Sequence, residues 1–307
     1  MKRYKSICVI GVACIVLLFF CATIFFAYRL LSPPLQTDEE LLSEYGVIDP
    51  ASLNLPVEEV TFLSRKDEVT ISGWWLPQEK SDRVFILVHG RSAGKKALVR
   101  YAQLFYSRGF SLLLIDLRGH GDSSSAPTTY GDRERYDVMG AVDWLSTKGI
   151  GEDDVIGIFG LSMGATAAYL AAIELNQERE RLVDIIIFDS GIPDIPETIT
   201  YNSRKSLGPL GAFFAPPAMA ISEVIGKADF EAASPINHPA DLMIPILFVM
   251  HTNDWLIPYE DQYRFFEAYT GDKFSLIFND LGHIRGHIEK REEYEAGLGL
   301  FLSTYGL

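Results

Sequence analysis

Cysteine is absent from most of this 307-residue chain. The three cysteines, Cys8, Cys14 and Cys21, all lie in one apolar segment near the N-terminus. The rest of the chain therefore has no thiol for a disulfide, a metal site or a cysteine nucleophile. A domain built without cysteine also tolerates an oxidising compartment.

Basic residues are scarce as well. The chain has 27 Lys and Arg against 41 Asp and Glu, which gives a formal net charge of −14. Nucleic acids and anionic lipid surfaces are bound by clustered Lys and Arg, so neither is expected as the main partner. No His, Asp or Glu cluster has the spacing of metal ligands, and we expect no metal and no organic cofactor.

Charged side chains are missing altogether from residues 6–28. As a helix with a rise of about 1.5 Å per residue, this stretch would be roughly 35 Å long, enough to cross a bilayer. A cleaved signal peptide is the alternative. The apolar run is longer than the usual signal core, and no small-x-small site precedes Arg29, which favours an uncleaved membrane anchor.

The charges on either side of this segment predict its orientation. Basic residues precede it, at Lys2, Arg3 and Lys5, whereas an acidic patch at 38–44 follows it. The positive-inside rule then places the N-terminus in the cytoplasm. We expect a single-pass protein of the cell membrane, with a cytoplasmic tip and anchor at 1–28, a Pro-containing tether at 29–56 and an extracytoplasmic folded domain at 57–307.

Short apolar runs alternate with helical stretches through the folded domain. Strands are predicted at 57–64, 68–76, 84–88, 111–115, 155–159, 185–188, 244–250 and 274–278. Helices are predicted at 95–108, 133–147, 163–176, 259–269 and 290–303. The first two strands alternate like an antiparallel pair, and the later ones are continuously apolar like buried parallel strands. The order predicts an α/β fold with a mostly parallel central sheet and helices on both faces.

A Gly-x-Ser-x-Gly sequence stands between a predicted strand and a predicted helix, at residues 160–164. A serine on such a sharp turn is held in strained backbone geometry, so its neighbours must be small for strand and helix to pack closely. Ser162 is therefore a candidate nucleophile. A serine hydroxyl is a poor nucleophile near neutral pH and needs a histidine base oriented by a carboxylate.

Candidates for both partners follow the later strands. Asp254 comes after the strand at 244–250, and His283 comes after the strand at 274–278. Asp189, at the end of an earlier strand, is the rival acid, and Asp254 could instead cap a turn or helix. His287 is the rival base and could equally be a surface histidine, whereas His251 lacks a suitable partner by position.

Acyl transfer also requires two backbone N–H groups aimed at the developing oxyanion. One comes from the residue after the nucleophile, Met163. The other is predicted at Arg91, because Gly90 lets the chain turn directly after the strand at 84–88. The Arg91 side chain is expected to be a solvated charge, with binding of an anionic substrate group as the alternative.

These motifs together resemble the α/β-hydrolase family over residues 57–307. They are His89-Gly90, the stretch Asp116-Leu117-Arg118-Gly119-His120-Gly121-Asp122-Ser123, the Ser162 turn, Asp254 and His283, in the expected order. The resemblance is nearest to the prolyl-oligopeptidase-like and dienelactone-hydrolase-like branch. It implies a structural rather than catalytic role for the 116–123 loop, and an α/β-hydrolase fold in which the cap is inserted before the last two strands.

The segment at 191–234 is predicted to form this cap. Its apolar stretch at 207–219 suits an acyl chain or a hydrophobic leaving group, or else packs against the body of the domain; contact with the nearby membrane is a third alternative. We therefore expect a serine hydrolase acting on a small hydrophobic acyl ester or thioester. A serine peptidase and a noncatalytic binding protein with the same fold are the alternatives.

Overall fold

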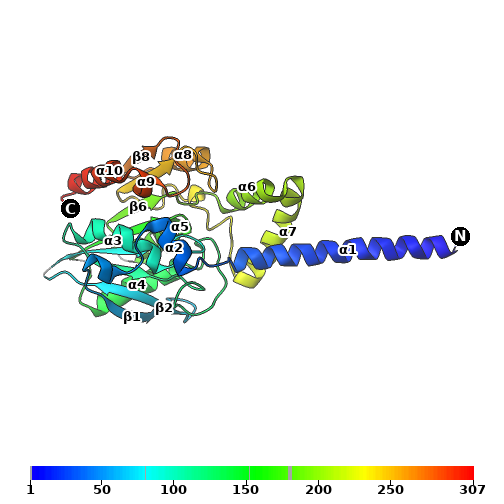
Figure 1. Cartoon of the computed structure of the whole chain (residues 1–307), viewed down its shortest axis with the longest axis horizontal. Helices are drawn as coiled ribbons and strands as arrows, with labels where there is room; N and C mark the ends of the chain where they lie inside the picture. Colours follow the sequence, from blue (N-terminus) through cyan, green and yellow to red (C-terminus); the bar gives the residue numbers. More distant parts are fainter. Residues whose placement is uncertain (1, 80, 152, 179–181) are drawn as a thin grey trace.

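An eight-stranded sheet forms the centre of the protein in the computed structural model, which describes residues 2–79, 81–151, 153–178 and 182–307 (Figure 1). Its strands are β1 (Glu58–Leu63), β2 (Thr70–Leu76), β3 (Arg83–Val88), β4 (Ser111–Ile115), β5 (Val155–Leu161), β6 (Ile185–Asp189), β7 (Ile246–His251) and β8 (Lys273–Phe278). Each of the eight predicted strands is present, with ends shifted by at most two residues.

The strand order is β1-β2-β4-β3-β5-β6-β7-β8. β1 pairs antiparallel with β2, and β2 pairs antiparallel with β4. All other pairings are parallel, from β4–β3 to β7–β8. The carboxyl ends of β3, β5, β6, β7 and β8 therefore lie along one edge, where an α/β sheet places its ligands.

Two hydrophobic cores cover the two faces of the sheet. In β3, Val84, Ile86 and Val88 belong to one core, and Phe85 and Leu87 belong to the other. Alternate side chains of a strand point to opposite faces, so a continuously apolar strand is one that is buried on both sides. This arrangement confirms the predicted α/β-hydrolase fold.

Helices pack on each face as the apolar pattern predicts. One core takes side chains from α4 (Arg135–Thr147), α5 (Met163–Glu178) and α8 (Tyr259–Ala268). The other takes them from η2 (Lys95–Leu98), α3 (Val99–Tyr106) and α10 (Arg291–Thr304), which follows the short α9 (Gly286–Glu289). The short η3 (Pro235–Asn237) lies before β7.

The segment at 29–56, expected to be a tether, is largely structured. It contains α2 (Asp38–Tyr45), whose N-terminus has a capping box between Thr37 and Glu40, and η1 (Pro50–Leu53). Leu41, Tyr45 and Leu55 are buried in the second core. This segment is therefore packed against the body of the domain.

The N-terminal helix and the helices of the cap stand out from the body, as Figure 1 shows. The N-terminal helix α1 (Lys2–Leu31) projects away from the body, and α6 (Ile195–Leu207) and α7 (Pro209–Gly226) lie at its base. The expected cap at 191–234 thus consists mainly of two helices that the sequence pattern did not predict. Within the described residues, two helices are long and apolar enough to cross a membrane, Ala13–Leu31 of α1 and Pro209–Gly226.

Candidate active site

Ser162 stands on the turn between β5 and α5, with φ of +52°. The two glycines around it are required sterically. A Cβ at Gly160 would lie 2.4 Å from Ala165 Cα, and a Cβ at Gly164 would lie 2.5 Å from the carbonyl oxygens of Val88 and His89. The serine is therefore held in a left-handed conformation by the close packing of strand, helix and neighbouring loop.

The loop after β3 presses against this turn. A Cβ at Gly90 would lie 3.2 Å from Ser162 Cβ, so the loop approaches as closely as a glycine permits. His89 supports the loop, because its Nε2 accepts the Leu117 N–H at 3.0 Å and its Nδ1 lies 2.7 Å from Gly90 O. Burial lowers the pKa of His89 to about 3, so its imidazole is neutral and Nδ1 carries the proton.

The sequence predicted two backbone donors beside Ser162; Met163 follows it in the chain, and Arg91 lines the same cavity. Arg91 follows Gly90 in the loop after β3, and Met163 begins α5. Within the described part of the chain, neither N–H donates a hydrogen bond to a protein acceptor. Both donors are therefore available to a ligand beside Ser162.

His283 and Asp254 are brought together from two different loops. His283 Nδ1 lies 2.7 Å from Asp254 Oδ2, and both residues are buried. A carboxylate only accepts hydrogen bonds, so Nδ1 carries the proton and Nε2 is the basic atom.

Both oxygens of the Asp254 carboxylate accept hydrogen bonds from groups other than His283. Its Oδ1 accepts the N–H groups of Leu256 and Ile257, both at 2.9 Å, and its Oδ2 also accepts from Gln262 Nε2 at 3.2 Å. Burial alone would raise the pKa of Asp254, but the nearby His283 and these hydrogen bonds outweigh it, so the pKa is lowered. Asp254 is therefore an anion over the whole neutral range.

Asp189, the rival acid, lies in a separate buried network. Its Oδ2 accepts the Tyr294 hydroxyl at 2.8 Å, and its Oδ1 accepts the Ser190 hydroxyl at 3.0 Å. Burial raises the pKa of Asp189 to about 7. Its backbone carbonyl accepts the Ser162 N–H at 2.8 Å.

Two histidines have environments that the sequence reasoning missed. His251 is part of the Asp189 network, since its Nε2 accepts the Gly286 N–H and its Nδ1 lies 2.9 Å from Ser190 Oγ. The suggestion that His287 is a surface residue is wrong, because it is fully buried with its ring 4.7 Å from that of Tyr101. The signal that could have found them is their position next to apolar, aromatic segments.

The Arg91 side chain is not a solvated charge. Its Nη2 donates to the carbonyl oxygens of Arg29 at 2.7 Å and Leu30 at 2.9 Å, and its guanidinium lies over the Tyr130 ring. These carbonyls belong to the last turn of α1, where unpaired acceptors and the helix dipole favour a cation. The predicted oxyanion loop is thus attached directly to the N-terminal helix.

Ser162 opens into two adjoining cavities. One, of about 430 Å³, lies between α1 and α6 and is lined by Phe26, Leu30, Ile199 and others. The second, of about 400 Å³, contains both Ser162 and His283. A reacting group at Ser162 can therefore reach His283 on one side and an apolar chamber on the other.

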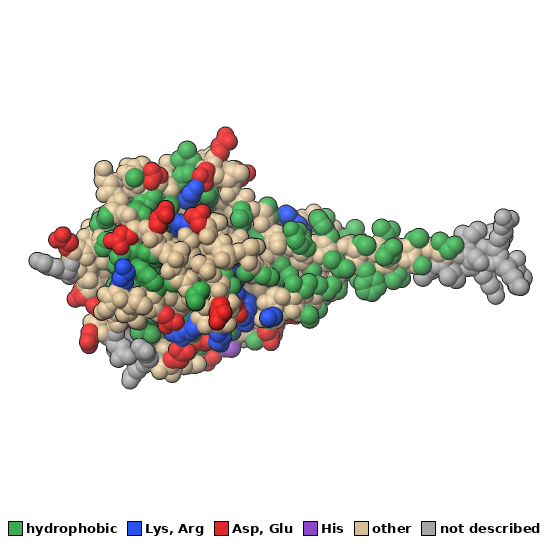
Figure 2. All heavy atoms as spheres, turned by 90° about the horizontal axis from the view of Figure 1, so that it is seen from below, with side chains coloured by type: hydrophobic (Ala, Val, Ile, Leu, Met, Phe, Trp, Pro, Cys, Tyr) green, Lys and Arg blue, Asp and Glu red, His purple; other side chains and the backbone are tan. Residues whose placement is uncertain are grey.

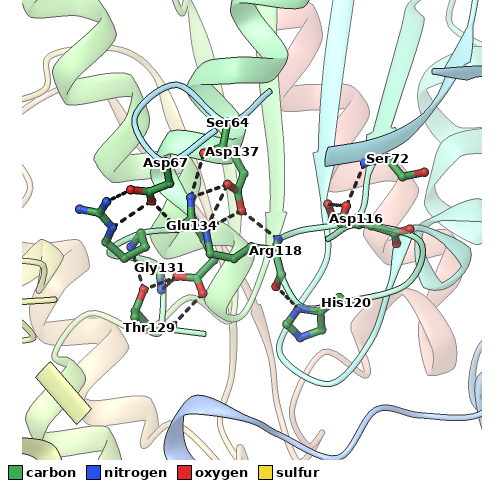
Figure 3. A network of polar contacts seen from close by, with 12 residues as sticks. Ser64, Asp67, Ser72, Asp116, Arg118, His120, Thr129, Gly131, Glu134 and Asp137 are labelled. Atoms are coloured by element: carbon green, nitrogen blue, oxygen red, sulfur yellow. Dashed lines mark hydrogen bonds and ion pairs between the residues drawn. The ribbon is translucent and has the colours of Figure 1, made fainter. Parts of the chain in front are cut away.

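The loop at 116–123 is a structural clamp beside this site. The Arg118 guanidinium donates to Asp137 at 2.7 Å, Asp67 at 2.6 Å and Ser64 at 2.8 Å, as Figure 3 shows. Asp116 accepts the Lys95 N–H at 2.6 Å and so connects this loop to the one that carries Arg91. The Asp116 and Arg118 side chains are thus engaged in contacts within the fold, which agrees with the structural role that the resemblance implied.

Known proteins of the same fold match most of the chain. A family model described as "Alpha/beta hydrolase family" matches residues 85–296. The uncharacterized protein YqkD of Bacillus subtilis is 26% identical over 241 residues, which cover 76% of this chain and 75% of that protein.

Within the described residues, no group of three or more His, Cys, Asp or Glu side chains is arranged to hold a metal ion.

Two solved structures share the architecture. The Pyrococcus furiosus esterase Pf2001 superposes with a TM-score of 0.70 at 23% identity, covering 90% of this chain and 98% of that one. The Pyrococcus horikoshii acylaminoacyl peptidase superposes with a TM-score of 0.62 at 17% identity, covering 82% of this chain and 41% of that one. With the family model spanning well over half of its length, the chain belongs to the alpha/beta hydrolase family.

Proposed function

We propose that the protein is a membrane-anchored serine hydrolase that cleaves carboxylic esters or thioesters through an acyl-enzyme on Ser162. The observation that carries the proposal is the strained Ser162 in one cavity with His283, whose Nδ1 is paired with Asp254. A nucleophile, a base and an orienting anion in this relation form the constellation of a serine hydrolase.

The proposed reaction uses only groups of this chain. Ser162 Oγ attacks the acyl carbon while His283 Nε2 takes the hydroxyl proton, and the negative oxygen of the tetrahedral intermediate is held by the Arg91 and Met163 N–H groups. His283 then gives its proton to the departing alcohol or thiol. Water hydrolyses the acyl-enzyme by the same steps in reverse order, with His283 again as base.

The lining of the first cavity favours a hydrophobic acyl substrate. Phe26, Leu30, Ile192, Ile199 and Ile257 contribute apolar side chains to it. An acyl chain of moderate length would bury its surface there with the carbonyl beside Ser162. The anchor assignment rests on α1, whose charge-free stretch is preceded by basic residues, as expected for a cytoplasmic N-terminus.

Peptide hydrolysis is the second candidate. Glu40 and Glu44 line the cavity that contains Ser162 and His283, and their carboxylates would suit a substrate ammonium group. An amide panel read through the same serine separates the two activities. Cleavage of aminoacyl amides with no cleavage of acyl esters would favour the peptidase.

Labelling with a fluorophosphonate probe tests the nucleophile. The full chain is required, because Phe26 and Leu30 of α1 form part of the cavity wall. We expect label on native protein and on Ser303→Ala, a serine variant in α10, but none on Ser162→Ala. Absence of label on folded native protein, together with no turnover of either substrate class, would instead support a noncatalytic binding protein.

A further inference from the structure

The cap helix α7 is apolar and largely uncovered. Its single charged residue is Glu223, whose Oε1 accepts the Phe230 N–H at 2.9 Å and so turns back toward the body. Several large apolar side chains are solvent-exposed instead, namely Leu210 (64%), Phe213 (62%), Val224 (80%) and Ile225 (56%). An uncovered apolar surface of this kind is expected to have a partner.

α7 packs against the part of α1 that is assigned to the membrane. The Phe214 ring stacks on Phe19 at 5.4 Å and on Phe26 at 5.8 Å. Phe19 precedes Arg29, the first charged residue after the apolar stretch, by ten positions or about 15 Å of helix. This is about half of a hydrocarbon core of roughly 30 Å. An α1 helix that crosses a bilayer would therefore carry part of α7 into it.

The α6–α7 hairpin cannot itself cross the bilayer. α6 begins shortly after β6, and α7 is followed by Phe230, which is buried in the core of the body. Both ends therefore stay on the same side. Lys227, directly after α7, provides a basic residue where the hairpin returns to the body, as is common at a lipid headgroup region.

The same surface continues onto the N-terminal helix. Figure 2 shows hydrophobic side chains over the described part of α1 and onward to the body at its base. Lipid is the partner that this continuity favours, because α1 is itself long and apolar enough to cross a membrane.

We propose that the α6–α7 hairpin inserts into the leaflet that faces the catalytic body, and that a lipid ester reaches Ser162 from this leaflet by passing between α1 and α6. The second half of this proposal rests on the proposed hydrolase function. The chamber of about 430 Å³ has Phe26 and Leu30 of α1 on one side and Ile199 of α6 on the other, with Ser162 also in its lining.

A buried polar group in this chamber suits the polar end of such a substrate. The Thr198 hydroxyl has no partner in the described part of the chain, although Thr198 is only 4% exposed and lines the chamber. A buried hydroxyl without a partner is costly, so an ester or hydroxyl oxygen of the lipid would be stabilised there. The chamber thus combines apolar walls with a hydrogen-bonding group near Ser162.

Depth-dependent quenching tests the insertion. In full-length protein with Cys8, Cys14 and Cys21 replaced by alanine, single cysteines at Leu210→Cys, Val224→Cys and Leu300→Cys would carry an environment-sensitive fluorophore. Leu300 is the matched control, because it is 68% exposed on α10, remote from α1 in Figure 1. In phosphatidylcholine nanodiscs, nitroxide lipids should quench positions 210 and 224 at least threefold more than position 300. Equal quenching of all three by aqueous iodide would overturn the insertion.

Activity tests the route of the substrate. The double variant Leu210→Asp/Val224→Asp should lose at least tenfold in turnover of a long-chain ester embedded in the nanodisc and keep its turnover of a water-soluble short ester. Leu300→Asp should keep both. An unchanged ratio of the two rates in the double variant would overturn entry from the leaflet.

Failure of the hydrolase proposal would look different. Native protein would then cleave neither ester, whereas nitroxide quenching at positions 210 and 224 would persist. That combination would retain the membrane contact and remove the route to Ser162.

Discussion

Replacing Asp254 with asparagine tests the proposed site most directly, because the substitution changes one atom in a densely bonded position. Asp254 Oδ1 accepts two backbone N–H groups, so an asparagine would keep its carbonyl oxygen there. Its NH₂ group would then occupy the place of Oδ2, facing both Gln262 Nε2 and His283 Nδ1.

The amide of Gln262 cannot rotate to relieve this contact without losing its hydrogen bond to the Ile257 carbonyl. Its Nε2 also donates to the Ile257 carbonyl at 2.9 Å, and rotation would set two oxygens against each other. The histidine is the group that adjusts. Its Nδ1 would accept from the new NH₂ group, the proton would move to Nε2, and Nε2 could no longer take the proton of Ser162.

The expected loss in kcat is roughly 10³–10⁴-fold, as for the wrong tautomer in a serine triad. The fold should survive, because the two backbone bonds are kept and only the contact with Gln262 turns unfavourable, at about 1–3 kcal/mol. Hydrolysis of a soluble p-nitrophenyl ester, with urea unfolding measured on the same samples, would check both values.

Asp189→Asn is the matched control. The Asp189 side chain bonds to Tyr294 and Ser190 rather than to His283, so kcat should change by no more than about threefold. The reasoning is refuted if Asp254→Asn keeps more than a tenth of the native kcat, or if Asp189→Asn is the variant that loses activity.

Three further outcomes are expected. Gly164→Ala should lower the free energy of unfolding by about 1–3 kcal/mol, because the new Cβ would lie 2.5 Å from two carbonyl oxygens. Gly299→Ala in α10 is the control and should leave the free energy of unfolding unchanged. Equal urea midpoints for the two variants would contradict this. Burial lowers the pKa of His251 to about 4, against 6.5 in the unfolded chain. The stability that the neutral, buried imidazole contributes is therefore present above pH 6.5 and is lost as the pH falls toward 4. Stability measured by urea unfolding should thus fall more steeply with acid in native protein than in His251→Gln, by up to about 1.4 kcal/mol per pH unit, and parallel curves would refute this. Arg91→Met should speed hydrogen exchange at 32–37 at least tenfold, because it removes the bonds to the last turn of α1, and unchanged exchange would count against the attachment.

Local patterns were sufficient to predict most of the fold. Continuous apolar runs identify strands buried on both faces, and the glycines around Ser162 identify a turn in which no larger residue fits. The cap helices escaped prediction, because Pro216 and Pro217 interrupt the usual helical signal and α7 is apolar without a clear periodic face. The structured segment at 29–56 escaped because its few buried residues are separated by polar ones.

The sequence by itself determined the eight strands, the serine turn and the order of the candidate residues, because each depends on neighbours a few positions away. Only the tertiary structure decided which carboxylate meets His283, since Asp189 ends β6, Asp254 follows β7 by three residues, and both lie at the same edge of the sheet. It also decided that Arg91 caps α1 and that α1 and α6 enclose the chamber at Ser162. Such contacts join residues tens to hundreds of positions apart, and their energies come from burial and hydrogen bonding that no local pattern records.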